Sequence, residues 1–364
     1  MLDSILDPGR LGLAAAIFAG FIGVLFIASR LVPGKKEPGV VLGDGSRVVY
    51  HLNGFRLFLV IAAAAALLFV TRPAALAAVH AHFFPLFAVA NVAAFSFSIY
   101  LAVRGRRREG KGRPGLLGFI VDCFYGVELN PTLGGVDLKM FSYRPSLMGL
   151  GLLNLSFAAA QYQELGHLTT RMMVYQVFYF AYLFNYFQFE YGMIFTWDII
   201  AERFGWMLVW GDYVLVPFFY SIPGWYLLHD QDPMPLWQVA ALSLLYVTGF
   251  ILFRGSNEQK HQFKVDPHKP IWGRPPESIA GRLLISGFWG VGRKLNYTGE
   301  LTMYAAWSLT TGFGSVIPYL LPLWLVALFS HRAWRDDQRC RAKYGPLWDA
   351  YCKKARFRMI PYLY

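Results

Sequence analysis

Long apolar segments separated by short polar loops dominate the chain. A helix that spans a bilayer needs about 20 mainly apolar residues. Runs near this length occur at Leu11–Val32, Leu57–Ala78, Phe83–Val103, Leu147–Tyr162, Met172–Phe195, Phe204–Leu228 and Leu236–Phe253. A last apolar run, Leu301–Phe329, is too long for one simple span, and its glycines and prolines predict a helical hairpin with the turn near Gly312–Gly314. The pattern therefore predicts an all-α, polytopic membrane bundle of roughly nine to ten helices, with Leu116–Tyr125 as a candidate tenth or re-entrant piece.

Composition supports a membrane protein. The 364 residues are 56% hydrophobic, 17% aromatic and only 15% charged, whereas a soluble domain carries roughly 25% charged residues. The first apolar run is long enough to remain as an anchor, so we expect no cleaved signal peptide. We expect residues 1–364 to form a single membrane domain, in which residues 1–170 supply the N-terminal transmembrane helices.

Basic residues gather on alternate loops, which predicts an orientation. They are dense after the first and third apolar runs, between Arg254 and Lys294, and from Arg332 to Arg358. The positive-inside rule places these loops and the C-terminus in the cytoplasm. The net charge of +12 then reflects topology and contact with lipid headgroups, and we expect no nucleic-acid partner. The predicted location is a multi-pass integral membrane protein of a bacterial inner membrane or the endoplasmic reticulum.

Several common sites are not predicted. Cys123, Cys340 and Cys352 have no metal-type spacing and are interpreted as reduced thiols. The histidines are scattered, no His/Cys/Asp/Glu cluster has ligand spacing, and we predict no metal. The sequence has no phosphate-binding glycine loop in a strand-to-helix context.

Ionisable residues inside apolar runs are functional candidates because they are costly in lipid. Tyr182, Tyr186 and Glu190 have the spacing i, i+4, i+8, which predicts two phenols and a carboxyl group on one helical face. One interpretation is a hydrogen-bond ladder between helices with ordinary aromatic packing. The other is a proton-donating line beside an apolar cavity, in which a phenol or a neutral carboxyl group acts as a general acid.

The polar tail after Phe329 also has two interpretations. If the preceding helix continues to Arg341, Arg332 and Asp336 share one face and Arg335 lies on the adjacent one. After Gly345–Pro346, a second short helix would bring Trp348 close to Tyr351 and Cys352. Guanidinium groups match phosphate oxygens, so the tail fits a nucleotide cofactor with its head in water. The alternative is a juxtamembrane segment that binds anionic lipid.

Two further segments carry candidate cofactor ligands. Lys260 and Lys264 are one helical turn apart and could clamp phosphates, or could simply be solvated. The stretch GVGRKLNYTGE supplies Arg293, Asn296 and Tyr297 just before the hairpin. The Asn and Tyr side chains there could bind a nicotinamide amide or ribose, or could cap the next helix.

Four stretches resemble the sterol reductase family, which includes Δ14- and Δ7-sterol reductases and the membrane domain of the lamin B receptor. They are DGSRVVYHLNGF (Asp44–Phe55), FYGVELNPTLGGVDLKMFSYRPSLMGLGLLNLS (Phe124–Ser156), TWDIIAERFGWMLVWGDYVLVPFFYS (Thr196–Ser221), and the segment from LLISGFWGVGRKLNYTGE through HRAWRDDQRCRAKYGPLWDAYC to RMIPYLY. The motifs are long and in family order. The resemblance implies reduction of a sterol ring double bond with NADPH, inside the bilayer and in contact with membrane lipid.

The resemblance also implies roles for individual residues. It places the sterol pocket and the NADPH site in residues 171–364. The positions expected to hold NADPH are Lys260, Arg332, Asp336, Tyr344 and Tyr351, and Asn296 and Arg335 lie in the same motifs. The chain departs from the family pattern in having Lys294 and Leu295 after Arg293, Glu300 for the usual Asp, and Lys264 for a common Arg. These changes make contacts at Arg293–Glu300 less secure than those of the tail.

The implied chemistry requires a proton donor. An isolated alkene is not an electrophile, so one carbon must be protonated before hydride reaches the resulting tertiary cation. For a Δ14 sterol, protonation at C15 leaves the cation at C14, in a pocket that must exclude water. The candidate donors are Tyr182, Tyr186 and Glu190, with Asp336 as an alternative. The overall motif texture favours Δ14 over Δ7 reduction by analogy.

Two other interpretations remain. Isoprenylcysteine carboxyl methyltransferases place a similar motif before a helical hairpin and a basic aromatic tail but bind S-adenosylmethionine. A non-enzymatic sterol-sensing or scaffold protein could retain a degenerate site. The long matches Phe124–Ser156 and Thr196–Ser221 favour the reductase.

Overall fold

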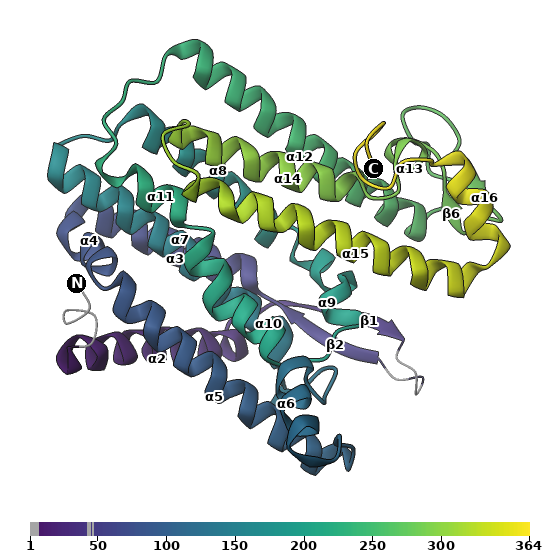
Figure 1. The fold of residues 1–364 in the computed structure, drawn as a ribbon, viewed down its shortest axis with the longest axis horizontal. Coiled ribbons are helices and arrows are strands. Elements are labelled where there is room, and N and C mark those ends of the chain that lie inside the picture. The colour runs from purple at the N-terminus through teal and green to yellow at the C-terminus, as the bar shows by residue number, and fades with distance from the viewer. Residues whose placement is uncertain (1–6, 42–44, 46) are drawn as a thin grey trace. The chain divides into compact units, whose positions relative to one another are not determined.

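The computed structural model describes residues 7–41, 45 and 47–364. It divides into two compact units, the first ending at Asp230 and the second comprising Gln231–Tyr364. Helices dominate both units (Figure 1), which confirms the predicted helical class. Asp44 and Ser46 of the motif Asp44–Phe55 lie outside the described residues.

The first unit consists of helices and two short β-hairpins. Its elements are α2 (Pro8–Leu31), β1 (Lys35–Val41), β2 (Arg47–Leu52), α3 (Gly54–Thr71), α4 (Pro73–Ala81), α5 (Phe83–Glu109), α6 (Gly115–Tyr125), β3 (Thr132–Leu133), β4 (Val136–Asp137), α7 (Leu138–Leu165), α8 (Thr170–Gln188), η1 (Glu190–Phe195), α9 (Trp197–Ile200), α10 (Trp206–Trp210), η2 (Gly211–Phe219), α11 (Ile222–Tyr226) and η3 (Leu227–His229). β1–β2 and β3–β4 are antiparallel.

Helix α7 is the centre of the first unit. It packs against α3, α4, α8 and η2, and most of its residues are buried. Its first turn is fixed by Asp137, whose carboxylate accepts a hydrogen bond from the backbone N–H of Met140 at 2.7 Å. The family-like motif around Asp137 therefore starts the helix on which the unit is assembled.

The second unit is a helical hairpin packed on one long helix, with a polar end. Its elements are α12 (Leu236–Val265), β5 (Ser278–Ile279), β6 (Leu283–Leu284), α13 (Phe288–Val291), α14 (Leu295–Ser308), η4 (Leu309–Thr311), η5 (Ile317–Tyr319), α15 (Leu320–Tyr344) and α16 (Pro346–Lys354). The third two-stranded sheet pairs β5 with β6. The predicted hairpin is confirmed, because α14 and α15 are joined through residues 309–319. The continuous tail helix and the short helix after Gly345 are also confirmed.

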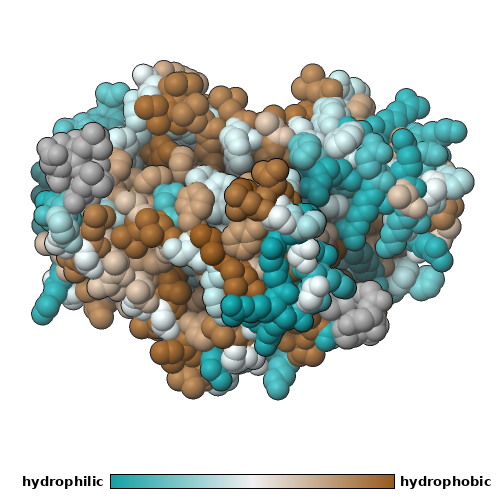
Figure 2. Space-filling view, turned by 60° about the horizontal axis from the view of Figure 1, so that its bottom comes forward, coloured by the Kyte–Doolittle hydropathy of each residue, from teal (hydrophilic) through white to brown (hydrophobic). Residues whose placement is uncertain are grey.

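Several helices have the length and surface of membrane spans. Among the described residues, α2, α3, α5 and α12 are long and apolar enough to cross a bilayer. Large apolar side chains are exposed along them, such as Val24, Val70 and Val92, and apolar residues cover much of the face seen in Figure 2. Because water would disfavour so much exposed apolar surface, lipid is the natural solvent for these helices.

Two of the predicted spans are wrong in detail, and other short elements differ from or add to the predicted pattern. The run Leu57–Ala78 is two helices, because the residue before Pro73 is disfavoured in the α conformation and Arg72 leaves it. Phe204–Leu228 is divided into α10, η2, α11 and η3, and Pro217 lies inside the π-helical turn. The piece at Leu116–Tyr125 lies in a helix of 11 residues, which is too short for a tenth span and leaves the re-entrant alternative. The all-α prediction also missed the three small hairpins.

Two glycines allow α12 and α14 to pack closely. A Cβ atom added at Gly299 would lie 2.4 Å from the backbone nitrogen of Phe253 and 2.5 Å from the carbonyl oxygen of Gly249. A Cβ atom added at Gly249 would lie 2.8 Å from the carbonyl oxygen of Gly299. Helix association in lipid depends on such close backbone contacts between small residues.

We therefore expect Gly299→Ala to destabilise the protein by about 1–3 kcal/mol, because the colliding atoms are backbone and cannot move aside. The measurement is the apparent unfolding temperature in detergent. Gly20→Ala in α2 is the matched control, since among the described residues no heavy atom beyond its own stretch of helix lies within 4 Å of the added Cβ. Equal unfolding temperatures for the two variants would contradict the role of this contact.

Candidate active site

The polar end of the second unit gathers most of the predicted cofactor residues. Lys260 and Lys264 lie near the C-terminal end of α12, Asn296 and Tyr297 begin α14, and the tail candidates lie on the polar half of α15 and on α16. The loop between α12 and α14 and the segment after α16 cover the same end. The structure therefore brings together side chains that are far apart in the sequence.

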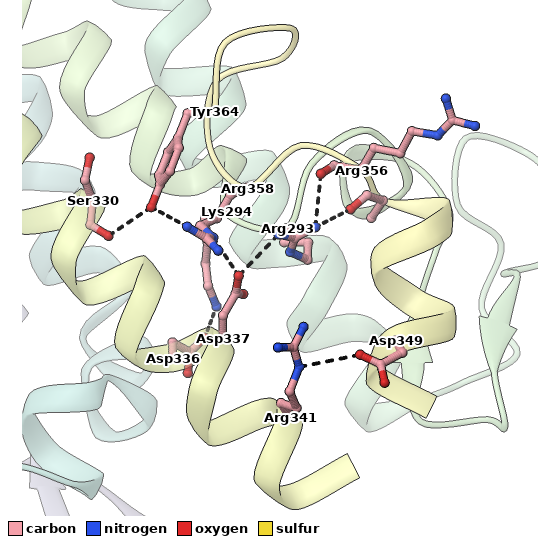
Figure 3. Close-up of polar contacts among 11 residues, drawn as sticks. Arg293, Lys294, Ser330, Asp336, Asp337, Arg341, Asp349, Arg356, Arg358 and Tyr364 are labelled. Atoms are coloured by element: carbon pink, nitrogen blue, oxygen red, sulfur yellow. Dashed lines mark hydrogen bonds and ion pairs between the residues drawn. The ribbon is translucent and has the colours of Figure 1, made fainter. Parts of the chain in front are cut away.

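Two consecutive basic residues pair with two consecutive acids at this end. The ammonium group of Lys294 pairs with the carboxylate of Asp336, and Nη2 of Arg293 lies 3.2 Å from Oδ2 of Asp337. Figure 3 shows both pairs between the start of α14 and the polar half of α15. Breaking a buried pair of this kind costs roughly 3–5 kcal/mol, so the pairs fix the loop before α14 against α15.

The Lys294–Asp336 pair is ionised at neutral pH. Burial raises the pKa of a carboxyl group, but the charges of Lys294, Lys260 and Arg339 outweigh burial at Asp336 and lower its pKa below the ordinary value. Burial also tends to lower the pKa of Lys294, and the carboxylate of Asp336 outweighs it and raises that pKa. Three cations from different segments thus converge on one carboxylate.

Exposed cations flank this pair. Lys260 and Lys264 on α12 and Arg335 on α15 are exposed, and Arg332 is half-buried. The ammonium group of Lys260 lies 4.6 Å from the ring centroid of Trp289, a cation–π contact. Ammonium and guanidinium groups bind phosphate oxygens through charge-assisted hydrogen bonds.

Aromatic side chains of α15 and α16 pack together at the polar end. Trp348 and Tyr351 are buried with their ring centroids 5.0 Å apart, and Tyr344 stacks on Trp348 at 6.4 Å. The phenol oxygen of Tyr351 lies 3.4 Å from the carbonyl oxygen of Trp289. The predicted proximity of Trp348 and Tyr351 is confirmed, and the contact between Tyr351 and Trp289 connects α16 to α13.

Asn296 has an unused buried acceptor. Its Nδ2 donates to Oδ1 of Asn257 at 3.2 Å, while its own Oδ1 is buried and has no hydrogen-bond partner among the residues that the structure describes. A buried acceptor of this kind is costly unless it binds a donor. An amide N–H₂ group of a ligand would satisfy it, so the site fits the nicotinamide of the predicted cofactor. Tyr297 stacks on Phe329, with the ring centroids 5.1 Å apart.

The guanidinium group of Arg293 binds groups of the protein itself. Its Nη1 donates to the carbonyl oxygens of Ala355 at 2.7 Å and Arg356 at 3.1 Å, in addition to the Asp337 pair. The side chain is buried. These contacts anchor the segment after α16, and direct contact between Arg293 and a cofactor remains a prediction.

Three of the candidate proton donors lie in the first unit, and the alternative, Asp336, lies in the second. Tyr182 is buried on α8, and its ring centroid is 5.7 Å from that of the half-buried Tyr186. The predicted common helical face is wrong at Glu190, because α8 ends at Gln188 and Glu190 begins the 3₁₀ turn η1. The two tyrosines remain neighbours, and the carboxyl group lies outside their helix.

Glu190 is held by an ion pair that the sequence did not reveal. Its Oε1 lies 3.1 Å from Nη2 of Arg144, and its Oε2 accepts a hydrogen bond from the backbone N–H of Gly54 at 2.8 Å. Arg144 also donates to the carbonyl oxygen of His51 at 2.8 Å. Glu190 thus connects α7, η1 and the start of α3.

Sequence reasoning missed Asp337, Arg358 and Trp289 at the polar end. Asp337 accepts from both Arg293 and Arg358, the second at 2.6 Å. Two adjacent acids in a basic tail indicate a role other than lipid binding, which does not need them, but the predicted site included only Asp336. The partners lie 44 and 21 residues away in the sequence, and nothing in the local pattern identifies them.

Comparison with known proteins gives a consistent result. The family model described as "Ergosterol biosynthesis ERG4/ERG24 family" matches residues 13–364. A Delta(14)-sterol reductase of Arabidopsis thaliana is 38% identical over 347 residues, which cover 93% of each chain. One of Methylotuvimicrobium alcaliphilum is 39% identical over 362 residues, covering 97% of this chain and 83% of the relative. One of Mus musculus is 36% identical over 350 residues, covering 93% and 83%.

These matches confirm the resemblance predicted from the four motif stretches. They extend over nearly the whole chain and include both units described above. On this basis, the chain belongs to the ERG4/ERG24 family of ergosterol biosynthesis proteins.

Proposed function

We propose that this protein is a Δ14-sterol reductase that uses NADPH to saturate the C14=C15 bond of a sterol. The observation that carries the proposal is the 36–39% identity, over more than nine-tenths of the chain, to relatives named Delta(14)-sterol reductase in a plant, a bacterium and an animal. The substrate is a lipid, and the apolar helices keep the protein in the same phase as that lipid.

The polar end of the second unit is the proposed NADPH site. When bound there, the cofactor supplies the hydride for C14 of the sterol. Lys260 and Lys264 are the proposed ligands of the diphosphate, and Arg332 and Arg335 those of the 2′-phosphate, because these cations are accessible on α12 and α15. Asn296 offers its buried acceptor to the carboxamide. Tyr344 offers a ring face for stacking, and the buried Tyr351 supports the same aromatic group through Trp348.

The remaining predicted ligands are assigned to support the site. Arg293 anchors the tail, and Tyr297 packs on Phe329. Asp336 is ionised and paired with Lys294. An ionised carboxylate has no proton to donate, so we propose that Asp336 orients Lys294 and the neighbouring cations and is not the general acid.

A phenol of the first unit is the proposed proton donor. Tyr182 is the first candidate because it is buried, and a dry environment protects a carbocation from water. Tyr186, whose ring contacts that of Tyr182, is the second. Glu190 is engaged by Arg144 and the N–H of Gly54, so we propose that it fixes the end of α8 near these phenols and does not itself protonate the alkene.

The orientation in the membrane is part of the proposal. The basic loops and the C-terminal segment face the cytoplasm, where NADPH is available, in either a bacterial inner membrane or the endoplasmic reticulum. The polar end of α12, α14 and α15 then lies on the cytoplasmic side.

The proposal is tested by incubating purified protein with NADPH and with Δ14, Δ7 or Δ24 sterols, followed by mass spectrometry. We expect one equivalent of NADPH to be oxidised as the Δ14 sterol gains two hydrogen atoms, and the other sterols to be unchanged. Reduction of the Δ7 sterol alone would show that the enzyme acts on the Δ7 double bond and not on the proposed C14=C15 bond. Thermal stabilisation by S-adenosylmethionine and not by NADPH would reject the reductase.

Arg332→Ala should weaken NADPH more than NADH. A charge-assisted hydrogen bond to phosphate is worth roughly 1.5–3 kcal/mol, or about a tenfold to hundredfold rise in KM for NADPH. Arg341→Ala is the matched control, because Arg341 is an exposed cation of the same helix, 3.5 Å from the exposed Asp349. An equal loss for both cofactors would remove Arg332 from the 2′-phosphate site.

Tyr182→Phe should lower kcat by about 10²–10⁴-fold if its phenol is the general acid, with little change in NADPH affinity. Tyr186→Phe, tested in parallel, decides between the two phenols. Tyr162→Phe on α7 serves as the control, since Tyr162 is exposed. Full turnover in both Tyr182→Phe and Tyr186→Phe would exclude a phenol of this pair as the donor.

A further inference from the structure

Asp336 and Asp337 are adjacent in sequence but face different groups. Successive residues of an α-helix point about 100° apart, so α15 presents the two carboxylates to different neighbours. Asp336 meets Lys294, close to the exposed cations. Asp337 is buried and meets Arg293 and Arg358 (Figure 3). The second acid has no role in the proposed function.

Asp337 joins two segments that lie outside its own helix. Its Oδ2 atom lies 3.2 Å from Nη2 of Arg293, in the loop before α14, and 2.6 Å from Nε of Arg358, in the segment after α16. One carboxylate oxygen thus accepts from two guanidinium groups. Without that charge, two buried or half-buried cations would face each other.

The segment after α16 folds back on itself through hydrogen bonds to Tyr364. The backbone N–H groups of Arg358 and Met359 donate to the carbonyl oxygen of Tyr364 at 2.9 and 2.8 Å. Nη1 of Arg358 donates to the phenol oxygen of Tyr364 at 2.5 Å. The segment also touches α14, because Thr298 donates to the carbonyl oxygen of Met359 at 2.7 Å.

The loop fixed by Asp337 carries residues of the proposed cofactor site. Arg293 is followed directly by Lys294, and Asn296 lies one turn further on, at the start of α14. The backbone N–H of Arg293 donates to the carbonyl oxygen of Phe357 at 3.0 Å. Loop and C-terminal segment are therefore held as one piece, and Asp337 connects that piece to α15.

We infer that Asp337 is a positioning residue that clamps the loop before α14 and the C-terminal segment to α15, and so sets the position of Lys294 and Asn296 for NADPH. The inference rests on the proposed function. It assigns Asp337 no contact with the cofactor or the sterol, and it predicts that loss of its charge weakens cofactor binding while the chemical step is retained.

The central test is Asp337→Asn in the full-length protein in detergent. We expect KM for NADPH to rise about tenfold while kcat at saturating NADPH stays within about twofold, the pattern of lost binding with chemistry retained. Direct NADPH titration followed by thermal unfolding should show the same weakening. Asp337→Glu, which restores the charge, should recover most of the affinity.

A second readout does not depend on activity. Trypsin cleaves after arginine, and Arg358 is half-buried in the clamp. Release of the Asp337 contact should accelerate cleavage after Arg358 at least several-fold, because protease sensitivity follows local opening. Mass spectrometry of the released residues 359–364 measures the rate.

Three further variants complete the design. Arg358→Gln should reproduce the rise in KM, and the double variant should be no worse than either single variant if the two side chains act through one contact. Asp349→Asn is the control, since this exposed acid of α16 pairs with an exposed arginine at 3.5 Å. It should leave both readouts unchanged.

The outcomes separate this inference from the proposed function. An unchanged KM for NADPH and an unchanged rate of cleavage after Arg358 in Asp337→Asn would contradict the inference that Asp337 acts as a clamp. A parallel fall in kcat and unfolding temperature, without recovery by Asp337→Glu, would also overturn it, because it indicates general destabilisation. Absence of NADPH-dependent reduction in the unaltered protein would defeat the proposed function, while the proteolysis comparison would still decide whether the clamp exists.

Discussion

A charge buried among apolar helices has to be paired, and this constraint determines much of the structure. An unpaired ion in a low-dielectric interior is several kcal/mol less stable than in water. In the first unit, the Arg144–Glu190 pair connects α7, η1 and the start of α3. In the second, Asp337 connects α15 to two separate segments. In both units, buried charged residues therefore connect secondary-structure elements that are separate in the sequence.

Lys139 shows the same constraint through backbone acceptors. Its buried ammonium group donates to the carbonyl oxygens of Ile199 at 2.9 Å and Glu202 at 2.7 Å. Those carbonyls belong to the end of α9 and the turn after it, where the backbone has left the regular helix. An interrupted helix thus supplies the free acceptors that a buried cation on α7 requires.

The hydropathy pattern predicted the helical class, the hairpin of α14 and α15 and the continuation of α15 into the polar tail, because these follow from local residue order. It did not predict the break at Arg72 or the end of α8 before Glu190. Glu190 is fixed by Arg144, 46 residues away, and by Gly54, 136 residues away. Local periodicity extends a helix through such a position, and only the tertiary partners reveal where it ends. Asp336 was predicted through the family resemblance, whereas the partners of its neighbour Asp337 lie 44 and 21 residues away and follow from no local pattern.

Helix α15 runs without interruption from an apolar half to a charged half. A helix rises 1.5 Å per residue, so the length of its lipid-embedded part sets how far its acids stand from the hydrocarbon. Lipids of different acyl length change that depth, because a span responds to mismatch by tilting or by deforming the bilayer. In the membrane orientation proposed above, the thickness of the bilayer would therefore set the depth of the ionic cluster relative to the lipid headgroups.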